Sequence, residues 1–150
     1  MILLLTLVVT FFDQLTKWLI CRNFGIHDFC EVIPGFFSLR KVFNVGAAWG
    51  MLSGQRLFLI VVSVAMLALL WHNRREFIES GKLCQVSIGL LTGGIIGNLI
   101  DRLRFGYVVD FLDFHWGTVY TFPTFNVADS SIFIGIVLFF LHTLFTKKRS

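Results

Sequence analysis

Charged residues are scarce in this chain. Asp, Glu, Lys and Arg make up only 15% of its 150 residues, whereas a soluble domain of this size carries about 25%. Hydrophobic residues make up 56%, and the mean hydropathy is +0.79. The net charge of +4 forms no dense basic face, which argues against nucleic-acid binding. The composition therefore excludes an ordinary soluble domain and indicates one membrane-embedded domain over residues 1–150.

Several motifs of known chemistry are also missing. The three cysteines, Cys21, Cys30 and Cys84, form no CxxC pair, which argues against a zinc knuckle or a dithiol redox motif. HExxH and GxSxG are absent, and "HDFCE" at 27–31 matches no standard metal spacing. We expect no metal, no cofactor and free thiols. A Cys21–Cys30 disulfide is the alternative.

Four apolar stretches predict transmembrane helices over residues 1–21, 56–72, 83–101 and 127–146. Each approaches the roughly 20 residues that a span needs. The first stretch lacks a basic n-region and a small-residue cleavage site, so it is not read as a secretory signal.

Lys and Arg predict the orientation of these helices. They are dense in two short stretches, the connection 73–82 and the C-terminal tail (Arg74, Arg75, Lys82, Lys147, Lys148 and Arg149). The long segments 21–56 and 101–131 hold as many, but more sparsely. Because basic residues favour the cytoplasmic side, we expect both termini in the cytoplasm and both long segments outside.

The long segments are rich in aromatic and β-branched residues. Residues 36–43 and 107–111 read as short strands. The expected fold class is thus a mainly α membrane protein, with four transmembrane helices and a small extracytoplasmic β-sheet element.

Three aspartates lie where apolar sequence ends. At 1.5 Å per residue, Asp101 lies about 28 Å beyond Lys82, and Asp129 about 27 Å before Lys147. A hydrocarbon core is about 30 Å thick, so both acids reach the outer boundary at similar depth. Asp110 lies between them on the strand-like segment. Polar groups at such depth are candidates for function.

Some of these residues also have a structural interpretation. Asp13 and Lys17 are spaced as an i,i+4 ion pair. Asn126 and Asp129 have the spacing of a capping box at the start of the last helix. Either interpretation is compatible with a role in a site.

The remaining acids differ in how well structure explains them. Asp101 with Arg102 fits a local anchor, and we expect Asp113 to face water. Asp110 has no such explanation. Two nearby carboxylates share a proton, so one acts as general base on water and the other as general acid. Such a pair hydrolyses an amide without a metal or a covalent intermediate.

Four motifs carry a family resemblance: "DQLTK" (13–17), "NVGAAW" (44–49), "GGIIGNLIDRLRFGYVVDF" (93–111) and "FNVADSSI" (125–132). In this order they resemble the lipoprotein signal peptidases, also called signal peptidase II. The resemblance covers nearly the whole chain. It implies a four-helix bacterial inner-membrane aspartyl endopeptidase, which cuts prolipoproteins just before a cysteine that carries diacylglycerol.

The resemblance also assigns residues. The catalytic residues fall on Asp110 and Asp129. The pocket that binds the substrate falls on Asn44, Asn98, Asp101, Arg102 and Asn126. Asp13 and Lys17 match the first-helix motif and are assigned a mainly structural part. The family usually has Phe and then Ser where this chain has Trp49 and Gly50, a departure that concerns only the loop over the pocket.

The implied partners are a diacylglyceryl prolipoprotein and membrane lipid, with no nucleic acid, and the protein is expected to be a monomer. It is expected in the bacterial cytoplasmic membrane, with the active site near the extracytoplasmic boundary. Gly89, Gly93 and Gly97 form a small-residue stripe that favours close helix packing. We expect the signal peptide's helix to lie near this stripe.

A different function class remains open at this point. A small four-helix protein with acids at the membrane boundary fits a proton-coupled transporter or an accessory subunit. A transporter needs polar groups at the midplane. Here the second and third spans offer little beyond Ser63, Ser87 and Thr92, which favours an enzyme.

Overall fold

The computed structural model describes residues 1–26, 28–47, 51–116 and 120–147. Its helices are α1 (Ile2–Asn23), α2 (Arg56–His72), α3 (Arg74–Glu79), α4 (Lys82–Arg104) and α5 (Val127–Lys147). Its strands are β1 (Phe29–Ile33), β2 (Phe37–Asn44), β3 (Val108–Trp116) and β4 (Tyr120–Thr121).

The long helices match the predicted spans within three residues at every end. By length and composition, α1, α4 and α5 are candidate membrane spans, whereas α2 is a shorter apolar helix of 17 residues. The short α3 was not predicted; it lies in the basic connection between α2 and α4.

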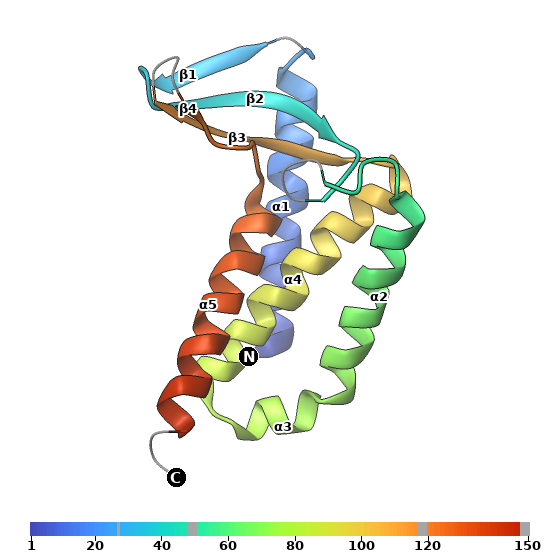
Figure 1. Ribbon diagram of the computed structural model, residues 1–150, viewed down its shortest axis with the longest axis vertical. Helices are drawn as coiled ribbons and strands as arrows, with labels where there is room; N and C mark the ends of the chain where they lie inside the picture. Colours follow the sequence, from blue (N-terminus) through green and yellow to red (C-terminus); the bar gives the residue numbers. More distant parts are fainter. Residues whose placement is uncertain (27, 48–50, 117–119, 148–150) are drawn as a thin grey trace.

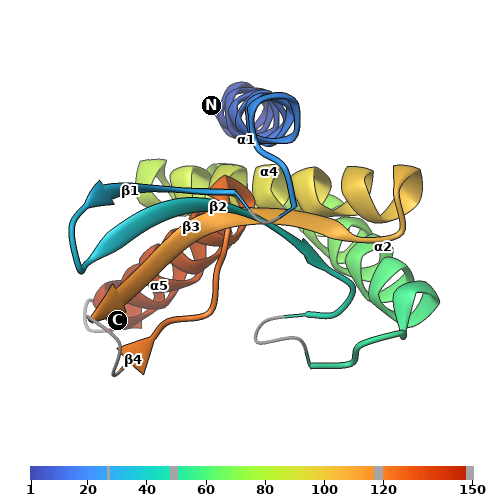
Figure 2. The same ribbon diagram turned by 90° about the horizontal axis from the view of Figure 1, so that it is seen from above.

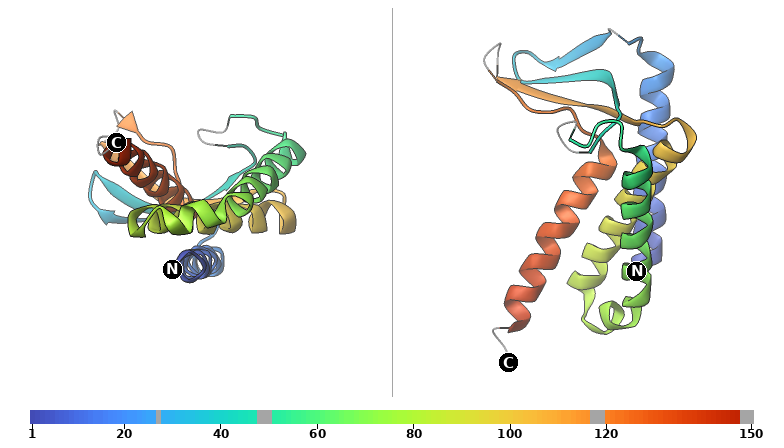
Figure 3. Two further views of the ribbon diagram at one scale, coloured as in Figure 1. Left: turned by 90° about the horizontal axis from the view of Figure 1, so that it is seen from below. Right: turned by 45° about the vertical axis from the view of Figure 1, so that its right-hand side comes forward.

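Helix α4 is the centre of the bundle. About half of its apolar stretch is buried, against 22% for α1 and 17% for α5. Helix α1 packs on one side of α4, while α5 and α2 lie on the other side and diverge from each other (Figure 2 and Figure 3, left). The outer faces of α1, α2 and α5 are strongly apolar and exposed, as expected for helices surrounded by lipid.

The glycine stripe of α4 lies against α1. A Cβ atom on Gly93 would come within 2.7 Å of Val9 Cβ, and one on Gly89 within 2.8 Å of Leu5 Cβ. Larger residues therefore do not fit at either position. The helix-packing interpretation of the stripe is confirmed. Because α1 already covers the stripe, the stripe itself is not free to contact the substrate's helix, and where that helix lies stays a prediction.

Polar side chains of α1 reinforce this contact. Each donates a hydrogen bond to a main-chain carbonyl of the stripe: Thr6 to Gly89 at 3.3 Å, Thr10 to Gly93 at 3.2 Å and Gln14 to Gly97 at 3.1 Å. The sequence offset is 83 residues in all three pairs, so α1 and α4 run parallel in a fixed register.

An antiparallel sheet in the order β1-β2-β3-β4 lies across one end of the helices, and the start of α1 and the end of α5 lie toward the other end (Figure 1). The small sheet and the strand at 36–43 are confirmed. Strand β3 continues to Trp116, well beyond the predicted end, and β1 and β4 were not predicted. Ile20 at the end of α1 packs against Val109 and Phe111, which fixes the sheet to the bundle.

Candidate active site

Asp110 lies on β3 and is 1% exposed. Its two carboxylate oxygens accept hydrogen bonds from separate amides, Asn44 Nδ2 at 2.9 Å and Asn126 Nδ2 at 2.6 Å. Burial raises the pKa of Asp110 to about 7, and the nearby charge of Asp129 adds to this rise. The two amide hydrogen bonds oppose the shift without cancelling it. Asp110 is therefore poised to exchange a proton near neutral pH.

Asp129 lies in the first turn of α5 and is half-buried. Its main-chain N–H donates to Asn126 Oδ1 at 2.9 Å, and its Oδ2 accepts from the Asn126 main-chain N–H at 3.3 Å. These are the reciprocal bonds of a capping box, so that interpretation is confirmed. The other oxygen, Oδ1, accepts from Asn98 Nδ2 at 2.7 Å. The capping role and a place beside Asp110 coexist.

Two asparagines join the acids. Asn126 is fully buried and contacts both Asp110 and Asp129. Its amide also donates to Asn98 Oδ1 at 3.2 Å. Strand β3, helix α4 and the start of α5 thus meet through one connected set of side chains.

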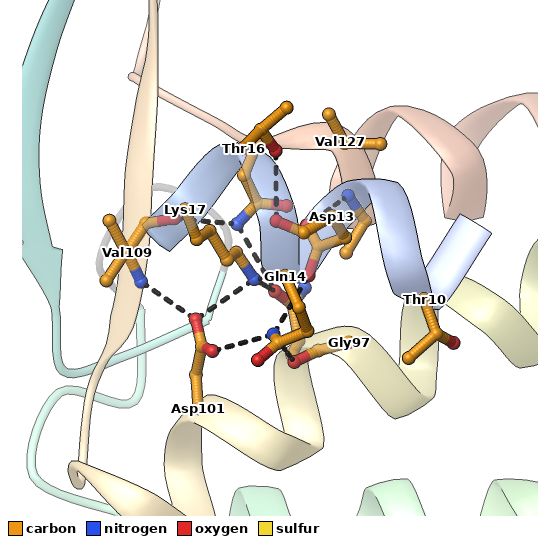
Figure 4. A network of polar contacts seen from close by, with 12 residues as sticks. Thr10, Asp13, Gln14, Thr16, Lys17, Gly97, Asp101, Val109 and Val127 are labelled. Atoms are coloured by element: carbon orange, nitrogen blue, oxygen red, sulfur yellow. Dashed lines mark hydrogen bonds and ion pairs between the residues drawn. The ribbon is translucent and has the colours of Figure 1, made fainter. Parts of the chain in front are cut away.

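A buried charge network adjoins this set (Figure 4). Lys17 Nζ lies 2.8 Å from Asp13 Oδ2 and 3.0 Å from Asp101 Oδ2. The i,i+4 pair foreseen from the sequence is present. Asp13 also accepts a hydrogen bond from the Ala128 N–H at 2.9 Å, so the pair helps to hold α5 as well as α4.

Asp101 is part of this network, and its contacts are not with Arg102. It is 2% exposed. Its oxygens accept from Gln14 Nε2 at 2.9 Å and from the Val109 N–H at 3.1 Å, besides pairing with Lys17. The local-anchor interpretation is therefore wrong, because Asp101 bonds across to α1 and β3 instead.

Arg102 and Asn44 bind the segment that follows β2. Arg102 Nη2 donates to the Gly46 carbonyl at 3.0 Å, and Asn44 Oδ1 accepts from the Gly46 N–H at 2.9 Å. The same Asn44 holds Asp110. The substitutions at Trp49 and Gly50 lie outside the described residues.

Asp113 does not face water, contrary to expectation. It is 5% exposed. It accepts a hydrogen bond from Thr124 Oγ1 at 3.4 Å, and Arg40 Nη1 lies 3.6 Å away. Asp113 lines a polar cavity of about 590 Å³ together with Arg40 and His115, and neither Asp110 nor Asp129 lines it. Because strand side chains alternate, Asp113 and Asp110 point to opposite faces of β3.

The cysteines are free. Cys21 and Cys30 are exposed and unbridged, and Cys84 is buried in the apolar contact between α2 and α4. The alternative of a Cys21–Cys30 disulfide is wrong. His27 of the "HDFCE" cluster and the basic tail residues Lys148 and Arg149 lie outside the described residues.

Sequence reasoning missed two residues that organise the site. Gln14 bonds to Asp101, and the spacing of Thr6, Thr10 and Gln14, four residues apart like the glycines of α4, was the available signal. Arg56 donates from Nε to the Arg102 carbonyl at 2.8 Å and closes the end of α4. Nothing in the sequence pattern pointed to this second contact.

The profile of the family described as Signal peptidase (SPase) II matches residues 5–145. Among curated proteins, the chain is 42% identical over 147 residues to a lipoprotein signal peptidase of Symbiobacterium thermophilum, covering 98% of this chain and 96% of the relative. It is 40% identical to a lipoprotein signal peptidase of Bacillus pumilus, covering 98% of this chain and 94% of that relative.

Solved structures agree in fold. A bacterial membrane enzyme determined by the in meso method at 2.3 Å superposes with a TM-score of 0.89 at 38% identity, covering 99% of this chain and 90% of the other. A second such enzyme, determined at 1.9 Å, superposes with a TM-score of 0.81 at 39% identity, covering 95% of this chain and 92% of the other. With these matches over nearly its full length, the chain belongs to the signal peptidase II family of lipoprotein signal peptidases.

Proposed function

We propose that this protein is a membrane aspartyl endopeptidase that removes the signal peptide from diacylglyceryl-modified prolipoproteins, cutting just before the lipidated cysteine. Family membership supports the activity. The observation that supports the aspartyl mechanism is the pairing of Asp110 and Asp129 through Asn126. The transporter alternative gains no support from the relatives.

The proposed roles follow from the contacts of each acid. Asp129 acts as general base: it takes a proton from water, whose oxygen then bonds to the scissile carbonyl carbon. Asp110 acts as general acid, because its pKa of about 7 leaves it about half protonated at neutral pH and mostly protonated below it. It gives its proton to the departing amide nitrogen as the carbon–nitrogen bond breaks. Asp129 then passes the proton that it took from water to Asp110, which returns the pair to its starting state.

Asn44, Asn98, Asn126 and Arg102 are proposed to form the pocket. The guanidinium N–H groups of Arg102 are suited to main-chain or ester oxygens near the cysteine. Asn126 is fully buried and its amide already donates to Asp110 and Asn98, so it is proposed to shape the pocket by holding the acids. Asp101 is proposed to organise this pocket from behind, since Gln14, Lys17 and Val109 already occupy its oxygens.

Four helices, α1, α2, α4 and α5, are proposed to cross the bacterial cytoplasmic membrane as one integral-membrane peptidase domain over residues 1–150. At 1.5 Å per residue the 17 residues of α2 reach about 26 Å. The start of α1 and the end of α5 lie away from the sheet (Figure 1), and the basic residues favour the cytoplasm for that end. The site, at the sheet end, then lies at the extracytoplasmic boundary.

Lipidation is proposed to place the scissile bond at the correct depth. Each buried CH₂ contributes about 0.8 kcal/mol to anchoring, so two acyl chains hold the cysteine in the outer leaflet. Because α1 covers the glycine stripe, the signal peptide's helix is proposed to lie on the opposite side of α4, where α2 and α5 diverge (Figure 2). The protein is proposed to act as a monomer.

The test is a cleavage assay with purified protein and a lipidated prolipoprotein. The expected result is a loss of mass equal to the signal peptide, unchanged by EDTA. An intact precursor after long incubation with folded protein would refute the proposed function.

A further inference from the structure

Lys17 is a buried cation that takes no part in the proposed chemistry. It is 3% exposed. Two of its contacts are ion pairs with Asp13 and Asp101, and a purely structural role would account for both. The third is a hydrogen bond of 3.0 Å from Nζ to Asn98 Oδ1. Of the three N–H donors of this ammonium, one is therefore directed to Asn98, the asparagine that holds Asp129.

This contact sets which way the Asn98 amide faces. Lys17 Nζ and Asn126 Nδ2 both donate to Asn98 Oδ1, at 3.0 Å and 3.2 Å. An ammonium can only donate, and an ionised carboxylate can only accept. The oxygen of Asn98 must therefore face Lys17, which leaves Nδ2 facing Asp129 Oδ1 at 2.7 Å. In the flipped orientation, Asn98 would place an oxygen against the carboxylate.

We propose that Lys17 is a positioning residue of the active site, which fixes the Asn98 amide so that Asn98 holds the Asp129 carboxylate in the orientation that accepts a proton from water. The inference rests on the proposed function and deepens it. Lys17 touches neither acid of the pair and acts through Asn98. Without it, Asn98 Oδ1 keeps only the longer bond from Asn126.

A purely structural role must be separated from this one. Lys17→Met alone leaves two buried acids unpaired, which is strongly destabilising. The double variant Asp13→Asn with Lys17→Met avoids this problem. The wild-type network holds two carboxylates and one ammonium, and the double variant holds one carboxylate, so the net charge is −1 in both.

The double variant also preserves the other hydrogen bonds of the network, except the 3.3 Å bond from Gln14 Nε2 to Asp13 Oδ2. Asp101 keeps its donors Gln14 at 2.9 Å and Val109 at 3.1 Å. An asparagine at position 13 keeps an oxygen for the Ala128 N–H. Asp13→Asn alone is the control that leaves Lys17 against Asn98. Its network has a net charge of 0, so the wild type, at −1, is the charge-matched reference for the double variant.

The experiment measures kcat, KM and Tm with a lipidated precursor. Asp13→Asn is expected to keep kcat close to that of the wild type. Relative to this control, the double variant is expected to lose about 10- to 100-fold in kcat, the cost of misplacing a group near the chemistry, with KM and Tm little changed. Equal kcat in the double variant and its control would overturn the proposal.

A second double variant, Asp13→Asn with Lys17→Gln, restores an uncharged N–H donor near Asn98. It is expected to regain part of the kcat lost with Met. Equally low kcat for Gln and Met would overturn the proposal, and failure of both to fold would assign Lys17 to folding alone. A wild-type protein that cleaves no lipidated precursor would instead refute the proposed function itself.

Discussion

The side-chain amide of Asn126 donates a 2.6 Å hydrogen bond to Asp110, although the two residues belong to different elements. Both are almost completely buried. The same asparagine also caps the turn that carries Asp129: its side-chain oxygen accepts from the Asp129 N–H, and its main-chain N–H donates to Asp129 Oδ2. One residue therefore positions both acids, and the pair is held by a strand and a helix terminus rather than by a long loop.

Asp110→Asn and Asp129→Asn are each expected to abolish turnover in protein that still inserts and folds. Asn keeps the shape and one of the two acceptor oxygens but cannot exchange the proton. Each loss is expected at about 10²- to 10⁴-fold. The double variant is expected to be little worse than either single one, because the two groups act as a unit. The measurement is the rate at which signal-peptide mass is lost.

Asp113→Asn is the control for these variants. It weakens a 3.6 Å ion pair with the half-exposed Arg40, on the face of β3 away from Asp110. Its kcat is expected to remain at the wild-type value. An inactive Asp113→Asn beside an active Asp110→Asn would show that the pair is wrongly assigned.

The raised pKa of Asp110 predicts how activity depends on pH. Below about pH 7 Asp110 keeps its proton, and above about pH 7 it loses it. As general acid it must be protonated, so kcat/KM is expected to fall as the pH rises through 7. The pH dependence of kcat/KM reports the pKa values of the acid and the base in the free enzyme. A kcat/KM that stays level up to pH 9 would contradict the role of Asp110 as the acid.

Stability provides a check that does not depend on turnover. The unfolded Asp110 ionises near 3.8 and the folded one near 7, so the folded state binds more protons between these values and loses stability as the pH rises through them. Asp110→Asn removes this penalty. The asparagine also loses one of the two amide hydrogen bonds at every pH, so the Tm of the variant minus that of the wild type is expected to be higher at pH 8 than at pH 4.

Gly93→Ala is expected to lower Tm without changing KM. The added Cβ meets Val9 Cβ at 2.7 Å and the Thr6 carbonyl at 3.0 Å, and overpacking of this kind costs about 1–3 kcal/mol. If the signal peptide lay along the stripe, KM would rise instead while Tm stayed constant. Melting curves and initial rates on the same preparation distinguish the two outcomes.

Arg102→Ala is expected to raise KM more than Arg104→Ala does. Arg102 bonds to the Gly46 carbonyl, next to the asparagine that holds Asp110. Arg104 is exposed and lies over the Phe105 ring. Equal KM values for the two variants would remove Arg102 from the proposed pocket.

An unlipidated precursor is expected to be cut far more slowly than its diacylglyceryl form in the same detergent. The small sheet offers little surface to grip a peptide, so the acyl chains must supply the anchoring. Equal rates for the two precursors would refute the positioning role of the lipid and leave the assignment of the two acids standing.

Much of the fold could be predicted because it follows from local pattern. Apolar length gave the bounds of α1, α2, α4 and α5, and alternation of aromatic and β-branched residues gave β2. The capping box at Asn126 and Asp129 was readable from spacing alone. Strand β1 was missed because its sequence, FCEVI, has no marked alternation, and all of its residues are exposed.

Contacts between distant segments could not be predicted in this way. Asp113 looked like a surface acid, but Arg40 and Thr124 approach it from other elements and bury it. Asp101 likewise bonds to Gln14 and Lys17 on α1 rather than to its neighbour in the sequence. Sequence spacing shows which residues share a face, and only the fold shows what lies opposite that face.

The constant offset between α1 and α4 has a consequence for how the site is assembled. Lipid tails are as apolar as the helices, so apolar contact alone does not favour one sliding position of α1 over another. A slip of one turn would move α1 by about 5.4 Å and separate Lys17 from Asp101 and Asn98. The hydrogen bonds from Thr6 and Thr10 to glycine carbonyls of α4 oppose that slip. Residues about two to three turns away along α1 thus set the position at which Lys17 meets the candidate active site.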